Sequence, residues 1–214
     1  MLFSDSRQAP AETLACSRRD YPEWHKGRQH YAVWLLEIEQ EDVLQRLQQA
    51  RHHLGSWLLD SRRQPHITLA VAGFLVDQPR YNDDACPLHL AALCRQLREQ
   101  PPRAISLTIG GLDSFASAAF LKVDDPLQQL PGLRRQLARG NDFRDSPYLP
   151  HLTVGLYGQR LQAAPVQARL QAFSEIQPLH LPCRSLSLCR YQADELQGPL
   201  HCIERFPLDT GSQG

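Results

Sequence analysis

The same short pattern occurs twice in this chain, and it constrains the fold more than any other feature of the sequence. Segment 65–68 reads Pro-His-Ile-Thr, and segment 150–153 reads Pro-His-Leu-Thr. Each copy continues into an apolar run with glycine, Leu-Ala-Val-Ala-Gly after the first and Val-Gly after the second. Apolar, β-rich runs bounded by proline and glycine are typical of strands. We therefore expect two strands that carry the same chemical groups.

The elements predicted around the two copies follow one order. Apolar runs and apolar residues at helical spacing predict strand, helix and strand in each half of the chain. The expected elements are strand 31–39, helix 43–54 and strand 65–72 in the first half, and strand 118–123, helix 127–137 and strand 149–157 in the second. Gly55 and Gly73 are placed to end the first helix and the strand after it. This self-similarity indicates an internal duplication.

The remaining segments complete an α+β fold with two related lobes. We expect helices at 88–97 and 166–173, and strands at 104–109, 181–191 and 200–206, the last without a counterpart in the other half. Gly110-Gly111 is interpreted as a turn between strands. Residues 1–28 are polar and non-periodic, so we predict a flexible N-terminal arm outside the core. Residues 29–209 then form a single bilobal domain, and 210–214 form a C-terminal tail.

In each copy of the pattern the histidine and the threonine are two residues apart, at positions i and i+2. Residues i and i+2 of a strand point to the same face, so each histidine is expected beside its threonine. One imidazole can accept a proton while another donates one at neutral pH, and threonine hydroxyls can hold phosphoryl oxygens. Nine histidines and five threonines in 214 residues predict roughly 0.2 such pairs by chance, whereas two are present.

At His66, Thr68, His151 and Thr153 the chain resembles the 2H phosphoesterase superfamily, which includes 2′,5′-RNA ligase-like proteins and cyclic phosphodiesterases. The resemblance covers about residues 31–206. It implies a bilobal, internally duplicated fold in which mainly antiparallel sheets line a central cleft, with helices on the outside. It also implies that the histidines are catalytic and the threonines bind phosphate. For hydrolysis of a 2′,3′-cyclic phosphate the resemblance makes His66 the acid and His151 the base, and the ligation direction exchanges these roles.

Our leading interpretation is a metal-independent phosphodiesterase, without a cofactor, that hydrolyses a 2′,3′-cyclic or related cyclic phosphate on RNA ends or small nucleotides. Two alternatives stay open. One is RNA 2′,5′-ligase activity, and the other is a non-catalytic nucleotide- or RNA-binding module of the same fold. The two intact motifs argue against the module, because binding alone needs no second proton-transfer group.

Four further residues are candidates for substrate contacts, namely Arg63, Arg144, Tyr148 and Tyr157. The first three precede a motif, where a guanidinium can meet phosphate and a ring can stack on a base. Tyr157 lies four residues beyond the second threonine, so a regular strand would turn it to the histidine face. Solvated loops and core packing are the competing explanations for these residues. No metal site is predicted, because the adjacent histidines 52 and 53 lack the other ligands of a zinc motif.

The charge balance bears on partners and location. Lysine plus arginine equal aspartate plus glutamate at 23 each, so no overall positive field attracts long duplex nucleic acid. The N-terminal segment has no basic start followed by an apolar run, and no apolar stretch is long enough to span a bilayer. We expect a cytoplasmic monomer without membrane association, whose six scattered cysteines are reduced.

Overall fold

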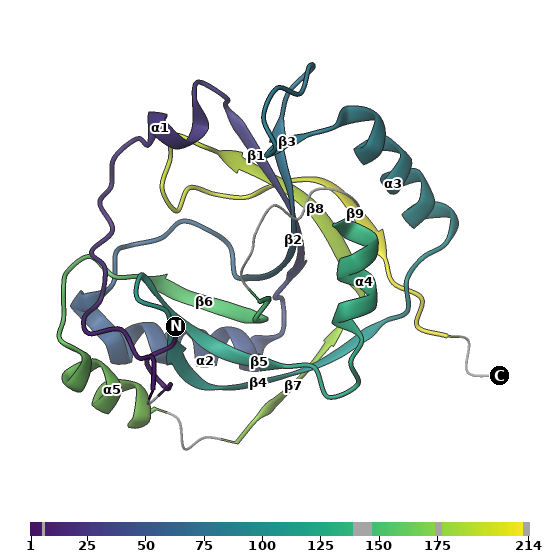
Figure 1. The fold of residues 1–214 in the computed structure, drawn as a ribbon. Helices are drawn as coiled ribbons and strands as arrows, with labels where there is room; N and C mark the ends of the chain where they lie inside the picture. The colour runs from purple at the N-terminus through teal and green to yellow at the C-terminus, as the bar shows by residue number, and fades with distance from the viewer. Residues whose placement is uncertain (6, 139–146, 174–176, 212–214) are drawn as a thin grey trace.

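Two curled β-sheets form the frame of the molecule (Figure 1). The computed structural model describes residues 1–5, 7–138, 147–173 and 177–211. The first sheet has the order β3-β2-β1-β8-β9 and the second has the order β6-β5-β4-β7. The first sheet consists of β1 (His30–Glu37), β2 (His66–Leu75), β3 (Asp84–Ala85), β8 (Ser185–Gln192) and β9 (His201–Pro207). The second consists of β4 (Ile105–Ser114), β5 (Ala118–Asp124), β6 (His151–Leu156) and β7 (Leu179–Cys183). Pairings within both sheets are antiparallel except that of β2 with β3, which confirms the predicted α+β fold.

Helices lie outside and between the sheets. They are α1 (Pro22–His25), α2 (Glu41–Leu54), a short 3-10 helix (Gly55–Trp57), α3 (Pro87–Glu99), α4 (Leu130–Leu137) and α5 (Ala163–Gln171). As predicted, α2 ends at Gly55, which adopts a positive φ of 54°. Helix α4 begins later than predicted, because the Asp125 carboxylate accepts the Gln129 and Leu130 amides and holds the preceding residues in a turn. None of the described helices is long and apolar enough to cross a membrane.

The helix of each half of the duplication packs on the other half. Helix α2 follows β1 but packs against β6 and β7, and α4 follows β5 but packs against β2. The two motif strands, β2 and β6, also contact each other. In Figure 1, α2 accordingly lies beneath β6. This exchange brings the two repeated motifs together between the lobes.

The C-terminal strands complete the first sheet. The predicted single strand 181–191 is wrong, because β7 ends at Cys183 in the second sheet and β8 begins at Ser185 in the first. Only Arg184 separates them, and it is not a residue that interrupts strand patterning. Strand β9 lies at the edge beside β8 as β7 lies at the edge beside β4, so the last strand does have a counterpart.

Two glycine predictions also need correction. Gly110 and Gly111 lie inside β4, at a shift in its register with β5, and form a bulge rather than a turn. Strand β2 continues past Gly73, whose φ is +107°. A Cβ at Gly73 would lie 2.5 Å from the Asp83 carbonyl oxygen, so glycine here allows the β3 segment to approach.

The N-terminal residues pack on the second lobe. Phe3 is 1% exposed within the main core, and its amide donates to the Ser114 carbonyl over 3.0 Å. The Leu14 amide donates to the Ala116 carbonyl over 2.7 Å, and the Thr13 hydroxyl donates to the Gln159 carbonyl. The prediction that residues 1–28 lie outside the core is therefore wrong, because a lone phenylalanine in a polar segment gives no periodic signal.

Candidate active site

The two motifs are built on equivalent strands with equivalent side-chain directions. Ile67 and Leu152, the middle residues, are fully buried in the core, whereas the histidine and threonine on either side of each are half-buried and point away from that core. His66 pairs across the sheet with Glu37, and the second motif histidine pairs with Lys122. The predicted alternation within each motif is confirmed.

A backbone hydrogen bond orients each imidazole in the same way. Nδ1 of His66 lies 2.7 Å from the Gln64 carbonyl oxygen, and Nδ1 of His151 lies 2.8 Å from the Leu149 carbonyl oxygen. A carbonyl oxygen can only accept, so Nδ1 carries the hydrogen in both rings. In a neutral ring Nε2 then holds the lone pair that can accept a proton. Phe115 and Phe120 pack beside the second ring, with centroid distances of 5.1 and 5.3 Å.

The surroundings of His66 favour its neutral form. Burial lowers its pKa from 6.5 to about 4, and the positive charges of Arg63 and His151 act in the same direction. The Gln64 carbonyl and the Glu37 carboxylate oppose this shift but do not reverse it. At neutral pH His66 is therefore a neutral base in the ligand-free protein.

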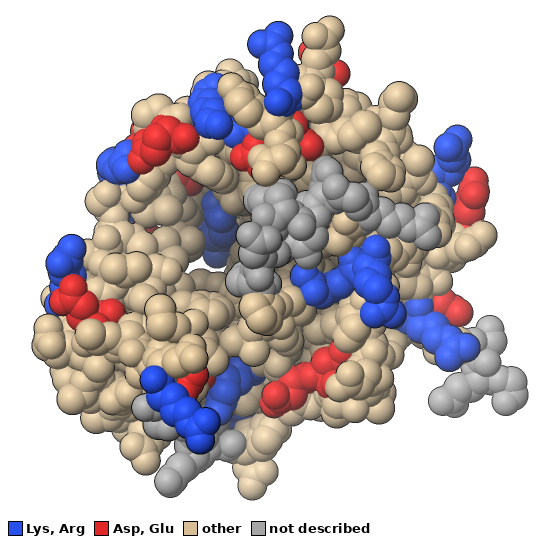
Figure 2. Space-filling model, viewed as in Figure 1, with Lys and Arg blue, Asp and Glu red and all other residues tan. Residues whose placement is uncertain are grey.

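Both motifs contribute to one cavity of about 170 Å³. His66 and Thr68 reach it from β2, and Thr153 reaches it from β6. The lining is completed by Arg51, Ser61, Arg63, Gln64, Pro65, Val154 and Gln197. His66 is the only histidine, cysteine, aspartate or glutamate among the described lining residues, so these do not form a metal-ligand cluster. Figure 2 shows a hollow in this view of the molecule, with basic side chains inside it and acidic ones at its rim.

Each motif strand is linked to the helix that packs on it by one arginine of that helix. The Arg51 guanidinium, on α2, donates from Nε to the Val154 carbonyl over 3.0 Å. The Arg134 guanidinium, on α4, donates from Nε to the Leu69 carbonyl over 2.7 Å. Each acceptor is the residue directly after the threonine of a motif. We call this pair of reciprocal contacts the arginine brace. Sequence reasoning placed both residues only in helical patterns, although their equivalent places in the duplicated order were a signal.

The comparisons with known proteins agree with this geometry. The model of the 2′-5′ RNA ligase superfamily matches residues 33–195, which is most of the chain. The chain belongs to the 2′-5′ RNA ligase superfamily. The resemblance to 2H phosphoesterases indicated by the sequence is thereby confirmed. A search of the curated proteins found no match.

Solved structures share the fold of this superfamily member. The crystal structure of Escherichia coli LigT complexed with 3′-AMP is 17% identical, with 84% of this chain and 98% of that chain covered and a TM-score of 0.58. TT0787 of Thermus thermophilus is also 17% identical, with the same coverages and a TM-score of 0.54. A conserved protein of unknown function from Agrobacterium tumefaciens, ATU0111, is 14% identical, with 85% and 87% covered and a TM-score of 0.56. At these identities the likeness shows the fold alone.

The structure separates the four weaker candidates of this superfamily member. Arg63 lines the cavity, where its Nε donates to the Gly198 carbonyl and its guanidinium stacks 3.8 Å from the Tyr191 ring centroid. The Tyr148 hydroxyl donates to the Thr68 carbonyl over 3.0 Å, so this side chain of the second lobe touches the first motif. Arg144 lies outside the described residues.

The prediction that Tyr157 faces the site is wrong. Its side chain is fully buried in the core, and its hydroxyl lies 2.9 Å from that of Ser114. The pairing of β5 with β6 shifts register between Thr153 and Gly155, so the alternation assumed for a regular strand is lost before residue 157. Burial raises the pKa of this phenol, which keeps it protonated.

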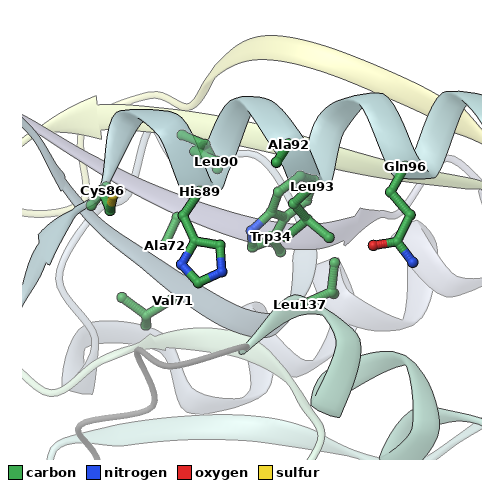
Figure 3. Close-up of a pocket in the computed structure, with 11 residues that line it drawn as sticks. Trp34, Val71, Ala72, Cys86, His89, Leu90, Ala92, Leu93, Gln96 and Leu137 are labelled. Atoms are coloured by element: carbon green, nitrogen blue, oxygen red, sulfur yellow. The ribbon is translucent and has the colours of Figure 1, made fainter.

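A second cavity, of about 200 Å³, lies beneath α3 and is mainly apolar. Figure 3 shows His89 and Gln96 of α3 on either side of it, over Val71 of β2, with Trp34 and Leu137 beside them. None of its described lining residues belongs to a motif of this superfamily member. The motif cavity is therefore the better candidate for the chemistry.

Proposed function

We propose that this protein is a metal-independent phosphodiesterase that hydrolyses a 2′,3′-cyclic phosphate on an RNA end or a small nucleotide. Membership of a superfamily of phosphoesterases supports the class of reaction. The observation that carries the proposal is that the two motifs lie on contacting strands and share one cavity, which His66, Thr68 and Thr153 line. In each motif histidine Nδ1 is held by the backbone, and Nε2 is left for proton transfer. A module that only binds a nucleotide needs no such matched pair.

In the proposed reaction both histidines act at the same phosphorus. One imidazole takes a proton from water as the water oxygen bonds to phosphorus, and the other gives a proton to the departing ribose oxygen as its bond to phosphorus breaks. Thr68 and Thr153 donate hydrogen bonds to the phosphoryl oxygens, whose charge grows in the transition state. Arg51 and Arg63 add positive charge to the same cavity. The product is a phosphate monoester beside a free hydroxyl.

A nucleotide substrate is supported by the similar structures. LigT of Escherichia coli has been crystallised with 3′-AMP, ATP and NADP⁺. A cavity of about 170 Å³ is small for a whole nucleotide, so we propose that it takes the phosphate and that the base lies outside it. The net charge of zero agrees with short RNA ends as substrates rather than long duplexes. We propose in addition that the protein is a cytoplasmic monomer.

One observation favours ligation as the second candidate. His66 is neutral in the ligand-free protein, which suits a proton acceptor better than a donor. Acceptor is the role that the superfamily resemblance implies for His66 in the ligation direction. For His66 to act as the acid of hydrolysis, the bound phosphate must raise its pKa, as a nearby negative charge does for a histidine.

The test uses protein stripped with a chelator and mixed with 2′,3′-cyclic mononucleotides or cyclic-ended oligonucleotides. We expect turnover to a phosphate monoester, slowed by roughly 10² to 10⁴ in His66→Ala and in His151→Ala. His89→Ala is the matched control, since this histidine lies beside the apolar cavity, and its turnover should be unchanged. Adding an oligonucleotide with a free 5′-hydroxyl tests whether ligation of the two oligonucleotides competes with hydrolysis of the cyclic phosphate.

Two results would oppose the proposal. Turnover that survives in a variant carrying both His66→Ala and His151→Ala would exclude the two-histidine mechanism. Binding of cyclic nucleotides without turnover by the intact protein, across the whole panel, would favour the non-catalytic module instead.

A further inference from the structure

Two cysteines and a glutamate meet on the face of the first sheet that carries His66. Cys189 of β8 and Cys202 of β9 are directly paired across the strands, and Glu37 ends β1. One ligand atom from each of the three lies within 4.8 Å of the others. No other group of three or more potential metal ligands occurs among the residues that the structure describes. None of these three residues takes part in the proposed reaction.

The carboxylate of Glu37 is only half satisfied. Its Oε2 forms an ion pair with Arg205, whereas Oε1 is buried and has no hydrogen-bond partner among the described residues. The hydroxyl of Ser187, two residues before Cys189 on the same face of β8, is also buried without a partner there. A buried oxygen without a partner costs free energy, which a cation at this place would recover.

The charges of the cluster point in the same direction. Glu37 and the two cysteines can each carry negative charge, and the described contacts place one cation, Arg205, against Glu37. A divalent cation would stabilise both thiolates and the carboxylate together.

We propose that Glu37, Cys189 and Cys202 form a binding site for a divalent transition-metal ion of the zinc type. Two thiolates and one carboxylate oxygen suit zinc, whereas calcium and magnesium require oxygen ligands throughout. On binding, each thiol releases its proton to solvent and the sulfur bonds to the metal. Cys202 is exposed, so the ion has a route of entry and a fourth position is open to water. Arg205 supports the site from outside through its bond to Glu37.

The site lies beside the proposed catalytic centre, since Glu37 pairs across the sheet with His66, but it does not depend on the proposed function. The proposed hydrolysis is carried by the histidines of the motif strands and needs no metal. Metal binding can therefore be measured without a substrate, and failure of one proposal leaves the other standing.

The test is a titration of the full chain with Co²⁺, after chelator treatment and in a phosphine reductant that keeps the thiols reduced. We expect one ion per chain, a near-ultraviolet charge-transfer band from thiolate to Co²⁺, and displacement by Zn²⁺. Cys202→Ser should lose about half of the band, because one of two thiolates is gone. Glu37→Gln should keep the band but weaken affinity by at least about tenfold, the lower bound known for loss of an outer-sphere partner.

Cys86→Ser is the matched control, because Cys86 is an exposed cysteine that precedes α3. It should bind Co²⁺ like the unchanged protein. The proposal is overturned if the band is absent, if it is undiminished in Cys202→Ser, or if Glu37→Gln binds as tightly as the unchanged protein. Because position 202 is exposed, Cys202→Ser folds normally and keeps the test decisive even if Glu37→Gln is unstable.

Discussion

Imidazole is a base whose affinity for a proton depends on its surroundings, and His66 has surroundings that lower this affinity. Its pKa of about 4 arises first from burial and then from two neighbouring positive charges. One of these is Arg63, which lines the same cavity. The adjacent Arg62 instead forms an ion pair with Glu195 and is exposed. Arg63 lies inside the site and Arg62 outside it, so comparing substitutions of the two isolates the effect of a nearby positive charge on the pKa of His66.

We predict that Arg63→Gln raises the pKa of His66, because removing a nearby cation makes the imidazolium less unfavourable. A profile of kcat/KM against pH reports the free protein, so the limb that His66 sets should move to higher pH. This limb is the low-pH one if His66 acts as the base and the high-pH one if it acts as the acid. Titration of the His66 ring by NMR should move in the same direction. In Arg62→Gln neither should move, and a shift common to both variants would count against a local effect.

At the level of single residues, the sequence predicts which side chains form the motifs better than it predicts their pKa values or surroundings. The motif histidines and threonines could be found because the i to i+2 spacing is local. The proton affinity of His66 could not, since it depends on burial and on His151 in the other lobe. Tyr157 was misplaced because a bulge in β6, set by pairing with β5, broke the assumed alternation.

The elements around the site are connected crosswise. Helices α2 and α4 each lie against the motif strand of the other lobe, and the arginine brace ties each helix to a strand carbonyl. Burial lowers the pKa of Arg51, which is consistent with a guanidinium held in a partly dry setting. The brace therefore couples the distance between the motifs to the packing of both helices.

We predict that Arg134→Met lowers the free energy of unfolding by about 1 to 3 kcal/mol, because it leaves the Leu69 carbonyl without its donor. Arg51→Met should have a similar effect through Val154. Denaturant unfolding followed by circular dichroism provides the measurement. Arg135→Met, on the exposed side of α4, should change the value by no more than about 0.5 kcal/mol. If Arg134→Met resembles this control, the brace does not stabilise the fold.

Element types could be predicted where periodicity was strong, as for β1, α2 and α3. The division between β7 and β8 could not be predicted, because Cys183, Arg184 and Ser185 include no glycine or proline that would mark a turn. The two strands are separate because they pair in different sheets. The packing of each helix on the other lobe could not be predicted either, because an amphipathic pattern shows which face of a helix is buried but not which strand it packs against.

At the scale of the whole molecule, both lobes and the N-terminal segment share one core. The main cluster includes residues of both sheets, such as Trp34 and Leu121, together with Phe3. Trp24 of α1 meanwhile packs on Tyr31 and Phe74 over the other face of the first sheet. Residues 1–28 thus touch both lobes, which the composition of that segment did not indicate.

We predict that Phe3→Ala lowers the free energy of unfolding by about 3 to 5 kcal/mol, as expected for truncating a fully buried aromatic ring. Leu14→Ala in the same segment should have an effect within about 0.5 kcal/mol, because Leu14 is 54% exposed. Thermal and denaturant unfolding of the two variants measure this difference. Equal stabilities would mean that the segment is not part of the cooperative fold.

The passage of the chain from β7 in the second sheet to β8 in the first, across Arg184 alone, determines the order in which the lobes can be finished. During synthesis on a ribosome, β1 emerges early, but its neighbour β8 is made only after the whole second sheet. Until then the edge of β1 is open, which is a condition that favours association with other chains. Closing a loop of this length also slows folding. The sheet that carries His66 is begun first and completed last.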